Sequence, residues 1–99
     1  MATIKLAVLK HTKSKDGSYK IRISIGHRSE THYIVTPYSV NALSEFDNGI
    51  VVRVPNAHEI NIKLRNLLND YEERLERIDS PEDYTCKELR DLLKSMRTH

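Results

Sequence analysis

The sequence lacks residues and segments on which several classes of protein depend. Cys86 is the only cysteine, which excludes an internal disulfide bond. No apolar run approaches the roughly 20 residues needed to cross a bilayer, and the N-terminal stretch has no apolar signal-peptide core. We therefore expect a cytoplasmic protein that makes no contact with a membrane.

The patterns typical of catalytic and metal-binding sites are also missing. There is no Walker loop, no G-x-S-x-G turn and no cysteine/histidine spacing suited to a metal, and the five histidines are scattered. A chain of 99 residues forms one domain at most and buries only about 60–65% of its unfolded surface. A core this small leaves too few residues to shape a deep pocket. We expect no enzymatic activity, no cofactor and no small-molecule substrate.

Charge is distributed unevenly behind a formal net charge of only +2. Residues 1–36 carry seven Lys/Arg and two acidic residues, whereas residues 56–99 carry eight Lys/Arg and ten acidic residues. A basic front half joined to a mildly acidic rear half favours a protein with one surface that faces a polyanion.

Alternating apolar and polar residues predict three strands, over residues 2–10, 19–25 and 31–36. The second has the clearest alternation, with Ile21, Ile23 and Ile25 on one face and Lys20, Arg22 and Ser24 on the other. The pair Asp16-Gly17 supplies a turn before it, and Pro37 is expected to end the third strand. Two successive hairpins predict a three-stranded antiparallel meander.

A long helix is predicted to cover the apolar face of this sheet, which gives an α+β fold class. From Asn56 to Ile78, apolar residues recur on one helical stripe: Ile60, Leu64, Leu67, Leu68, Tyr71, Leu75 and Ile78. Asn56 and Glu59 have the spacing of a capping box that begins the helix. Between sheet and helix, residues 50–54 are compatible with a short extra strand, and Phe46 is expected to close the edge of the core.

A second capping box, Thr85 with Glu88, predicts an additional short helix with Leu89, Leu92, Leu93 and Met96 on one side. The long helix is about 35 Å in length at 1.5 Å per residue, and a seven-residue strand spans about 23 Å. Its last turns therefore overhang the sheet, to be covered either by the short helix or by a further domain. We expect the second arrangement, with residues 1–78 as the binding domain and residues 79–99 as a linker and short helix that lead toward a further domain.

A helix-backed sheet leaves its other face uncovered, and we call this the open face. From the first two strands it is expected to present Lys5, Ala7, Leu9, Lys20, Arg22 and Ser24. The third strand contributes His32, Ile34 and Thr36 or, if its register differs by one residue, Tyr33 and Val35. Such a surface suits the major groove of double-stranded DNA, which admits β-structure as well as helices.

Several of these side chains, together with cations of the hairpin loops, have distinct expected roles. Arg22 lies mid-strand and is placed to pair with guanine, while Lys20, Lys13, Lys15 and Arg28 reach phosphates. Ala7, Leu9 and Ile34 are expected to contact thymine methyl groups or deoxyribose. The competing explanation is that these cations only keep a sheet face solvated.

Three stretches of the sequence also carry a family resemblance: "KDGSYKIRISI", "HRSETHYIVT" and "YSVNALSEFDNGIVVRVPNAHEINIKL". Together they resemble the N-terminal arm-binding domain of tyrosine-recombinase integrases, especially those of mobile elements in Bacteroides-type bacteria. The likeness covers residues 3–78. It departs from the family at Phe46, where tryptophan is common.

The resemblance implies a β-sheet module that docks in the major groove of arm-type sites flanking the crossover region during DNA integration. It also implies other integrase subunits as partners and a bacterial cytoplasmic location, on the nucleoid when bound. The family's catalytic domain, with its nucleophilic tyrosine, has no counterpart in this chain, so no tyrosine here takes that role. The alternative is a protein-interaction module that uses the sheet face or the helix overhang.

Overall fold

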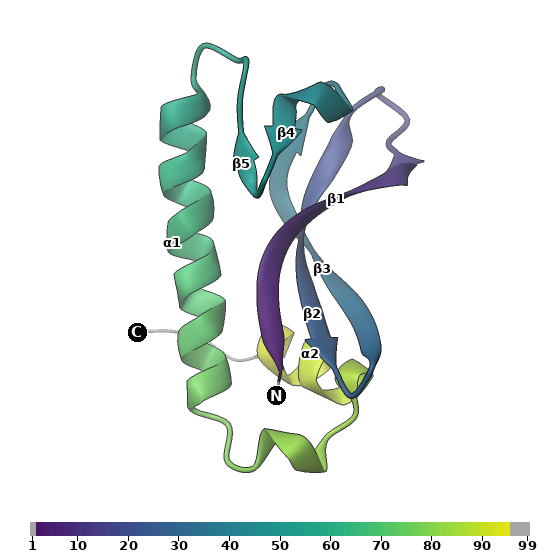
Figure 1. Ribbon diagram of the computed structural model, residues 1–99, viewed down its shortest axis with the longest axis vertical. Helices are drawn as coiled ribbons and strands as arrows, with labels where there is room; N and C mark the ends of the chain where they lie inside the picture. The colour runs from purple at the N-terminus through teal and green to yellow at the C-terminus, as the bar shows by residue number, and fades with distance from the viewer. Residues whose placement is uncertain (1, 96–99) are drawn as a thin grey trace.

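The computed structural model describes residues 2–95, apart from the side chain of Thr12, and has the predicted α+β fold (Figure 1). Its elements are β1 Thr3–Lys13, β2 Tyr19–His27, β3 Glu30–Val40, β4 Phe46–Asp47, β5 Ile50–Val51, α1 Ala57–Glu76 and α2 Cys86–Ser95, with short 3-10 turns at Leu43–Glu45 and Pro81–Asp83. No helix in the described range is long and apolar enough to cross a membrane.

The first three strands form an antiparallel sheet in the order β1-β2-β3, which confirms the predicted meander. Leu6 lies opposite Ile23 and Ile23 lies opposite Ile34, so the apolar residues of all three strands share one face. The strands are longer than predicted, and β1 and β3 each span 11 residues.

The expectation that Pro37 ends the third strand is wrong, because β3 runs through it to Val40. The ladder between β2 and β3 shifts register here. The Thr36 hydroxyl donates to the carbonyl of Ile21 at 2.6 Å and accepts from the N–H of Tyr38 at 3.2 Å. The Thr36 side chain thus replaces part of the main-chain hydrogen bonding between β2 and β3. Because β3 is an edge strand, the missing N–H of Pro37 is tolerated.

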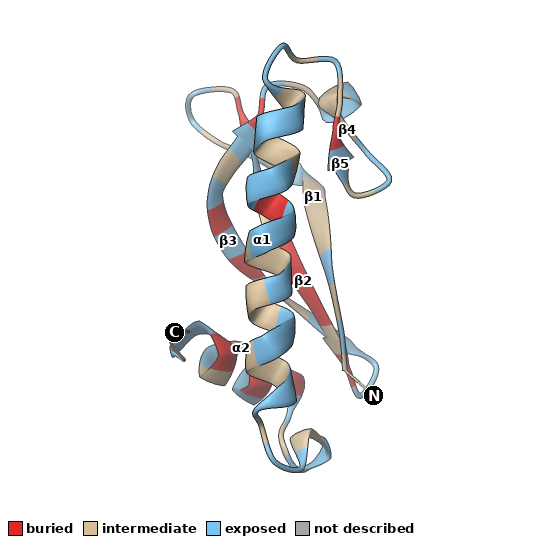
Figure 2. Cartoon of the chain, turned by 90° about the vertical axis from the view of Figure 1, so that its left-hand side faces the viewer, coloured by how far each residue is buried: buried red, intermediate tan, exposed pale blue. Residues whose placement is uncertain are grey.

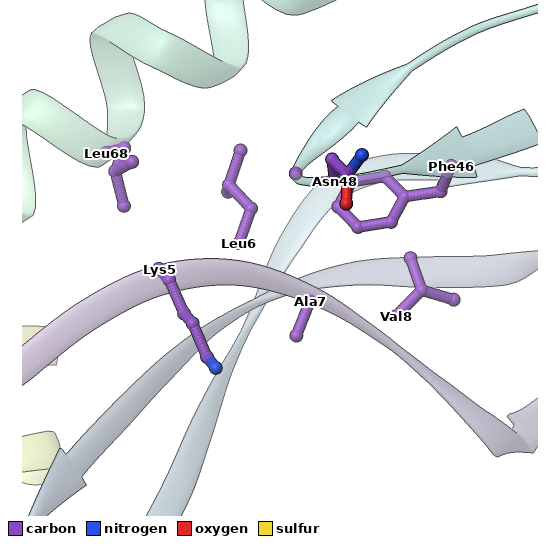
Figure 3. A pocket seen from close by; sticks show the side chains of 8 residues that line it. Lys5, Leu6, Ala7, Val8, Phe46, Asn48 and Leu68 are labelled. Atoms are coloured by element: carbon purple, nitrogen blue, oxygen red, sulfur yellow. The ribbon is translucent and has the colours of Figure 1, made fainter.

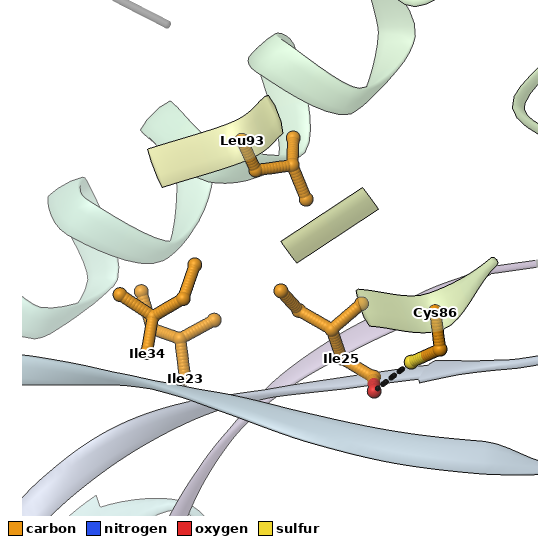
Figure 4. Packing of buried hydrophobic residues seen from close by; sticks show 5 residues of the cluster. All are labelled: Ile23, Ile25, Ile34, Cys86 and Leu93. Carbon is orange, nitrogen blue, oxygen red and sulfur yellow. Dashed lines mark hydrogen bonds between the residues drawn. The ribbon is translucent and has the colours of Figure 1, made fainter. Parts of the chain in front are cut away.

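The core lies between the apolar face of the sheet and a layer made by α1, α2 and the β4–β5 hairpin. Ile21, Ile23 and Ile25 of the central strand are completely buried. Towards the β4–β5 hairpin, Ile21 packs with Val40, Val51 and Leu64. Towards α2, Ile23 and Ile25 pack with Ile34, Cys86 and Leu93 (Figure 4). The open face lies on the other side of the same strands.

Helix α2 folds back onto the sheet and covers the end of α1. Tyr71, Leu75 and Ile78 pack against the cluster that contains Cys86 and Leu93. The expected bare overhang is therefore wrong: the short helix, rather than a further domain, covers these residues. The predicted boundary at residue 78 thus falls within one packed core. Met96 lies outside the described residues.

The two helix starts differ in how they are capped. Thr85 and Glu88 form the predicted reciprocal box: Thr85 N–H donates to Glu88 Oε1 at 2.8 Å, and Glu88 N–H donates to Thr85 Oγ1 at 3.1 Å. Asn56 does precede α1, but its side chain makes no capping hydrogen bond. Its φ of −103° and ψ of 23° depart from the extended conformation usual at this position. The capping box expected at Asn56 is therefore wrong.

The β4–β5 hairpin is held to α1 by one side-chain amide. Asn61 Oδ1 accepts from Val51 N–H at 2.7 Å, and Asn61 Nδ2 donates to Val51 C=O at 2.9 Å. The amide thus pairs with Val51 as a neighbouring strand would. The extra strand expected within residues 50–54 is confirmed over Ile50–Val51, and Phe46 packs against the same end of the core.

Candidate nucleic-acid interface

The strand register defines the open face as three rows of side chains. Residues directly opposite each other in an antiparallel pair point to the same side of the sheet. The rows are Thr3–Gly26–Thr31, Lys5–Ser24–Tyr33 and Ala7–Arg22–Val35. In the described part of the chain, the two buried clusters draw their sheet residues from the opposite face. The sheet therefore presents this side to solvent.

Arg22 occupies the centre of the open face, between Ala7 on β1 and Val35 on β3. Its side chain is partly buried, and Nε lies out of solvent without a hydrogen-bond partner among the described residues. Val35 beside it is 49% exposed. The middle of this face is thus a guanidinium framed by two apolar side chains, with the Nε–H unpaired within the described residues.

Lysines extend the positive charge away from Arg22. Lys5 and Lys20 are exposed, and both alternate with core residues of their strands, so they project from the open face. Ser24 also lies on this face but is only 4% exposed. Lys5 and Tyr33, its neighbours in the row, are much larger and shield it. Ser24 is therefore a packing residue, and the expectation that it contacts DNA loses its geometric basis.

The tip of the β1–β2 hairpin carries Lys15, which is exposed. Asp16 organises this tip, because its Oδ1 accepts from Ser18 N–H at 3.0 Å and from Ser18 Oγ–H at 2.7 Å. These hydrogen bonds hold the pKa of Asp16 below its ordinary value of 3.8. The lysine is thus carried on a turn with a defined shape.

Two predicted residues of the third strand lie on the wrong side of the sheet. Ile34 is opposite Ile23, is 4% exposed and belongs to the core. His32 is opposite Ile25, and its Nε2 lies 3.5 Å from Glu30 Oε1. The predicted open-face positions of Ile34 and His32 are therefore wrong, and the other register, with Tyr33 and Val35, is the one adopted.

Three further candidates lie away from the centre of the open face. Lys13 is opposite Tyr19, a core residue, and its Nζ lies 6.0 Å from the centroid of that ring. Arg28 donates to the carbonyl of Tyr84 at 3.4 Å. Leu9 is half-buried in the irregular stretch of β1 between Val8 and Lys13. The structure thus brings Lys5, Ala7, Lys20 and Arg22 together and leaves these three at the margin.

The β2–β3 turn sets the register that places Tyr33 and Val35 on the open face, and it carries no clear sequence marker. The β2–β3 connection is a two-residue turn in which Arg28 and Ser29 have φ values of 54° and 65°. A turn of this length places His27 opposite Glu30 and so sets the register as far as the pair Arg22–Val35, beyond which the ladder shifts. Neither residue is a glycine or asparagine, which are the usual markers of such a turn.

Comparison with protein-family models, with curated proteins and with solved structures found no match to this chain. Among residues 2–95, no group of three or more His, Cys, Asp or Glu side chains is arranged to hold a metal ion. What the site can do therefore follows from the shape and charge of the open face.

Proposed function

We propose that this chain is a DNA-binding module that places the open face of β1, β2 and β3 in the major groove of duplex DNA. The observation that carries the proposal is Arg22, which lies at the centre of an uncovered sheet face and whose Nε has no hydrogen-bond partner among residues 2–95. An arginine so placed suits bidentate pairing with O6 and N7 of guanine.

The dimensions of the sheet support this docking. Neighbouring strands are about 4.8 Å apart, so the outer strands of a three-stranded sheet are separated by roughly 10 Å. The major groove is about 12 Å wide. The open face therefore fits the groove when Arg22 points at the base edges.

The neighbours of Arg22 supply the remaining contacts. Ala7 and Val35 are apolar and lie beside it in the same row, where they contact thymine methyl groups. Lys5, Lys20 and Lys15 are exposed and reach phosphates on the walls of the groove. Base recognition is thus concentrated in one row of side chains, and phosphate contacts surround it.

We further propose that the module serves a site-specific recombinase by binding arm-type sites beside the crossover region. The support is the resemblance of residues 3–78 to integrase arm-binding domains, together with the open sheet face. A site selected by this chain from random duplexes is expected to occur in the DNA flanking the crossover region of a mobile element. Selection of sites only elsewhere would contradict the recombinase role.

The test of DNA binding compares variants on the selected duplex and on its single-base variants. Arg22→Ala is expected to cost about 1–3 kcal/mol and to relax specificity at one base position. Lys15→Ala is expected to weaken all sequences about equally, because it removes a phosphate contact. Lys87→Ala, on the exposed side of α2, is the matched control and leaves affinity unchanged. Amide shift changes confined to α1 and α2 would refute docking through the open face.

A further inference from the structure

The apolar face of the sheet is covered unevenly. Its central column of Ile21, Ile23 and Ile25 is fully buried. On β1, in contrast, Ile4, Leu6 and Val8 point to the same side but are only half-buried. Figure 2 shows the buried residues on β2 and β3 behind α1, and none among the described side chains of β1. The helical layer therefore leaves the β1 side of the core partly open.

An open cavity of about 600 Å³ occupies this gap. It lies between β1, α1, and β4 with the turn that follows it. Leu6 and Val8 form its floor, and Phe46 and Leu68 stand on either side (Figure 3). Lys5 also lines it but points to the other side of β1. Because residues from both faces of β1 line the cavity, it includes the outer edge of the strand.

The backbone at this edge is available for pairing. β1 is one of the two edge strands of the sheet. Within residues 2–95, Lys5 to Val8 take part in no hydrogen bond outside the ladder with β2. An unpaired strand edge beside an apolar floor is the geometry that accepts an additional strand, in which main-chain bonds give affinity and alternate side chains give specificity.

The charges around this cavity favour one kind of bound segment. Its lining, with the smaller hollow that continues it past Leu68, contains Lys5 and Arg65 and no acidic residue. A second copy of this chain would bring like charges together along the new pair of strands. An extended segment with acidic side chains would instead meet complementary charge.

We propose that the edge of β1 binds an extended segment of a partner protein, in which apolar residues alternate with acidic ones, as a fourth strand of the sheet. The apolar side chains lie over Leu6 and Val8 and against Leu68. The acidic side chains lie beside Lys5 on the open face. This site goes beyond the proposed DNA contact, because it uses the strand edge and the gap in the helical layer.

The test titrates a short synthetic peptide of alternating valine and glutamate into the isotopically labelled protein and follows amide and methyl resonances. We expect shifts at Lys5 to Val8, Phe46 and Leu68, with slower hydrogen exchange along β1. The same peptide N-methylated at alternate positions is the control, because it cannot pair with the strand edge. Equal binding of the N-methylated peptide, or no shifts with either peptide, would overturn the proposal.

A charge exchange makes the test specific. Lys5→Glu changes an exposed side chain and is expected to weaken the glutamate peptide about fivefold, while favouring the matched valine–lysine peptide. No change in this preference would contradict the acidic partner. Peptide-free shifts of the same residues that grow with protein concentration would assign the edge to a second copy instead. DNA is expected to move Arg22 and Val35 together with Lys5 and Ala7, whereas the peptide is expected to move Phe46 and Leu68. Arg22 and Val35 on the one hand, and Phe46 and Leu68 on the other, therefore distinguish the failure of one proposal from the failure of the other.

Discussion

At the scale of single residues, Asp16 sets the shape of the hairpin tip that carries Lys15. Its carboxylate accepts two hydrogen bonds from Ser18, and these lower its pKa below 3.8. Because the folded pKa lies below the unfolded one, the stabilisation is present above about pH 4 and is lost as the pH falls through the folded pKa. The carboxyl therefore stabilises the fold at neutral pH and not in acid.

The corresponding variant is Asp16→Asn. We expect it to unfold at lower urea concentration than the wild type at pH 7, and the difference to shrink towards pH 2.5. Urea unfolding at a series of pH values measures this. Asp47→Asn, an exposed carboxylate in the β4–β5 hairpin, controls for the loss of one negative charge. A stability difference that stays constant with pH would contradict the role given to Asp16.

Asn61 is a second residue whose side chain alone fixes the position of a neighbouring segment. It holds both backbone groups of Val51, which is 2% exposed. Asn61→Leu leaves a buried N–H and a buried C=O unpaired and is expected to cost about 1–3 kcal/mol of unfolding free energy. Asn69→Ala, on the exposed side of the same helix, is expected to stay within about 0.5 kcal/mol of the wild type. Equal effects of the two variants in urea unfolding would refute the pairing role.

At the scale of elements, the periodicity of apolar residues predicted strands and helices better than the individual residues at the ends of those elements. The alternation in β2 and the apolar stripe of α1 predicted both elements and the faces they bury. The sequence does not determine the register of β3, because a two-residue turn without glycine or asparagine looks like part of a longer loop. One residue of register exchanged Ile34 and His32 for Val35 and Tyr33 on the open face.

The same capping-box spacing formed at Thr85 and failed at Asn56, because the box also requires an extended backbone at its first residue.

Long-range contacts could not be predicted from the sequence patterns. The docking of α2 depends on Cys86 and Leu93 meeting Ile25 and Ile23, which are some 60 residues or more distant in sequence. Such a contact is specified by the fit of surfaces and leaves no local signature.

The docking of α2 makes a prediction at this scale. Leu89 is fully buried, and Leu89→Ala is expected to cost about 2–5 kcal/mol. Cys86 reports on the same event, because burial raises the pKa of its thiol above 9.0 and keeps it neutral and unreactive while α2 is seated. Alkylation of Cys86 is therefore expected to be slow in the wild type and faster in Leu89→Ala. Rapid alkylation of the wild-type protein, with Lys94→Ala as the surface control, would refute this packing.

At the scale of the whole molecule, the charges divide between the two layers. Most of the basic residues of the first half lie on or near the sheet, and the acidic excess lies in the helical half. If about four to six phosphates are neutralised, the logarithm of the DNA association constant falls against the logarithm of salt concentration with a slope of about −4 to −5. Fluorescence anisotropy across a salt series measures it. A slope near zero would favour the alternative, an apolar protein contact.

The position of β2 has a kinetic consequence. It is hydrogen-bonded to a strand on each side, and its isoleucines are sealed beneath the helices. Its amides are therefore expected to exchange with solvent only when the whole molecule unfolds. We therefore expect the strand that holds Arg22 to be among the most rigid parts of the fold, so that a ligand that binds it loses little entropy in ordering the backbone. The proposed recognition surface is thus expected to have its final shape before the ligand binds, and not to close around the ligand.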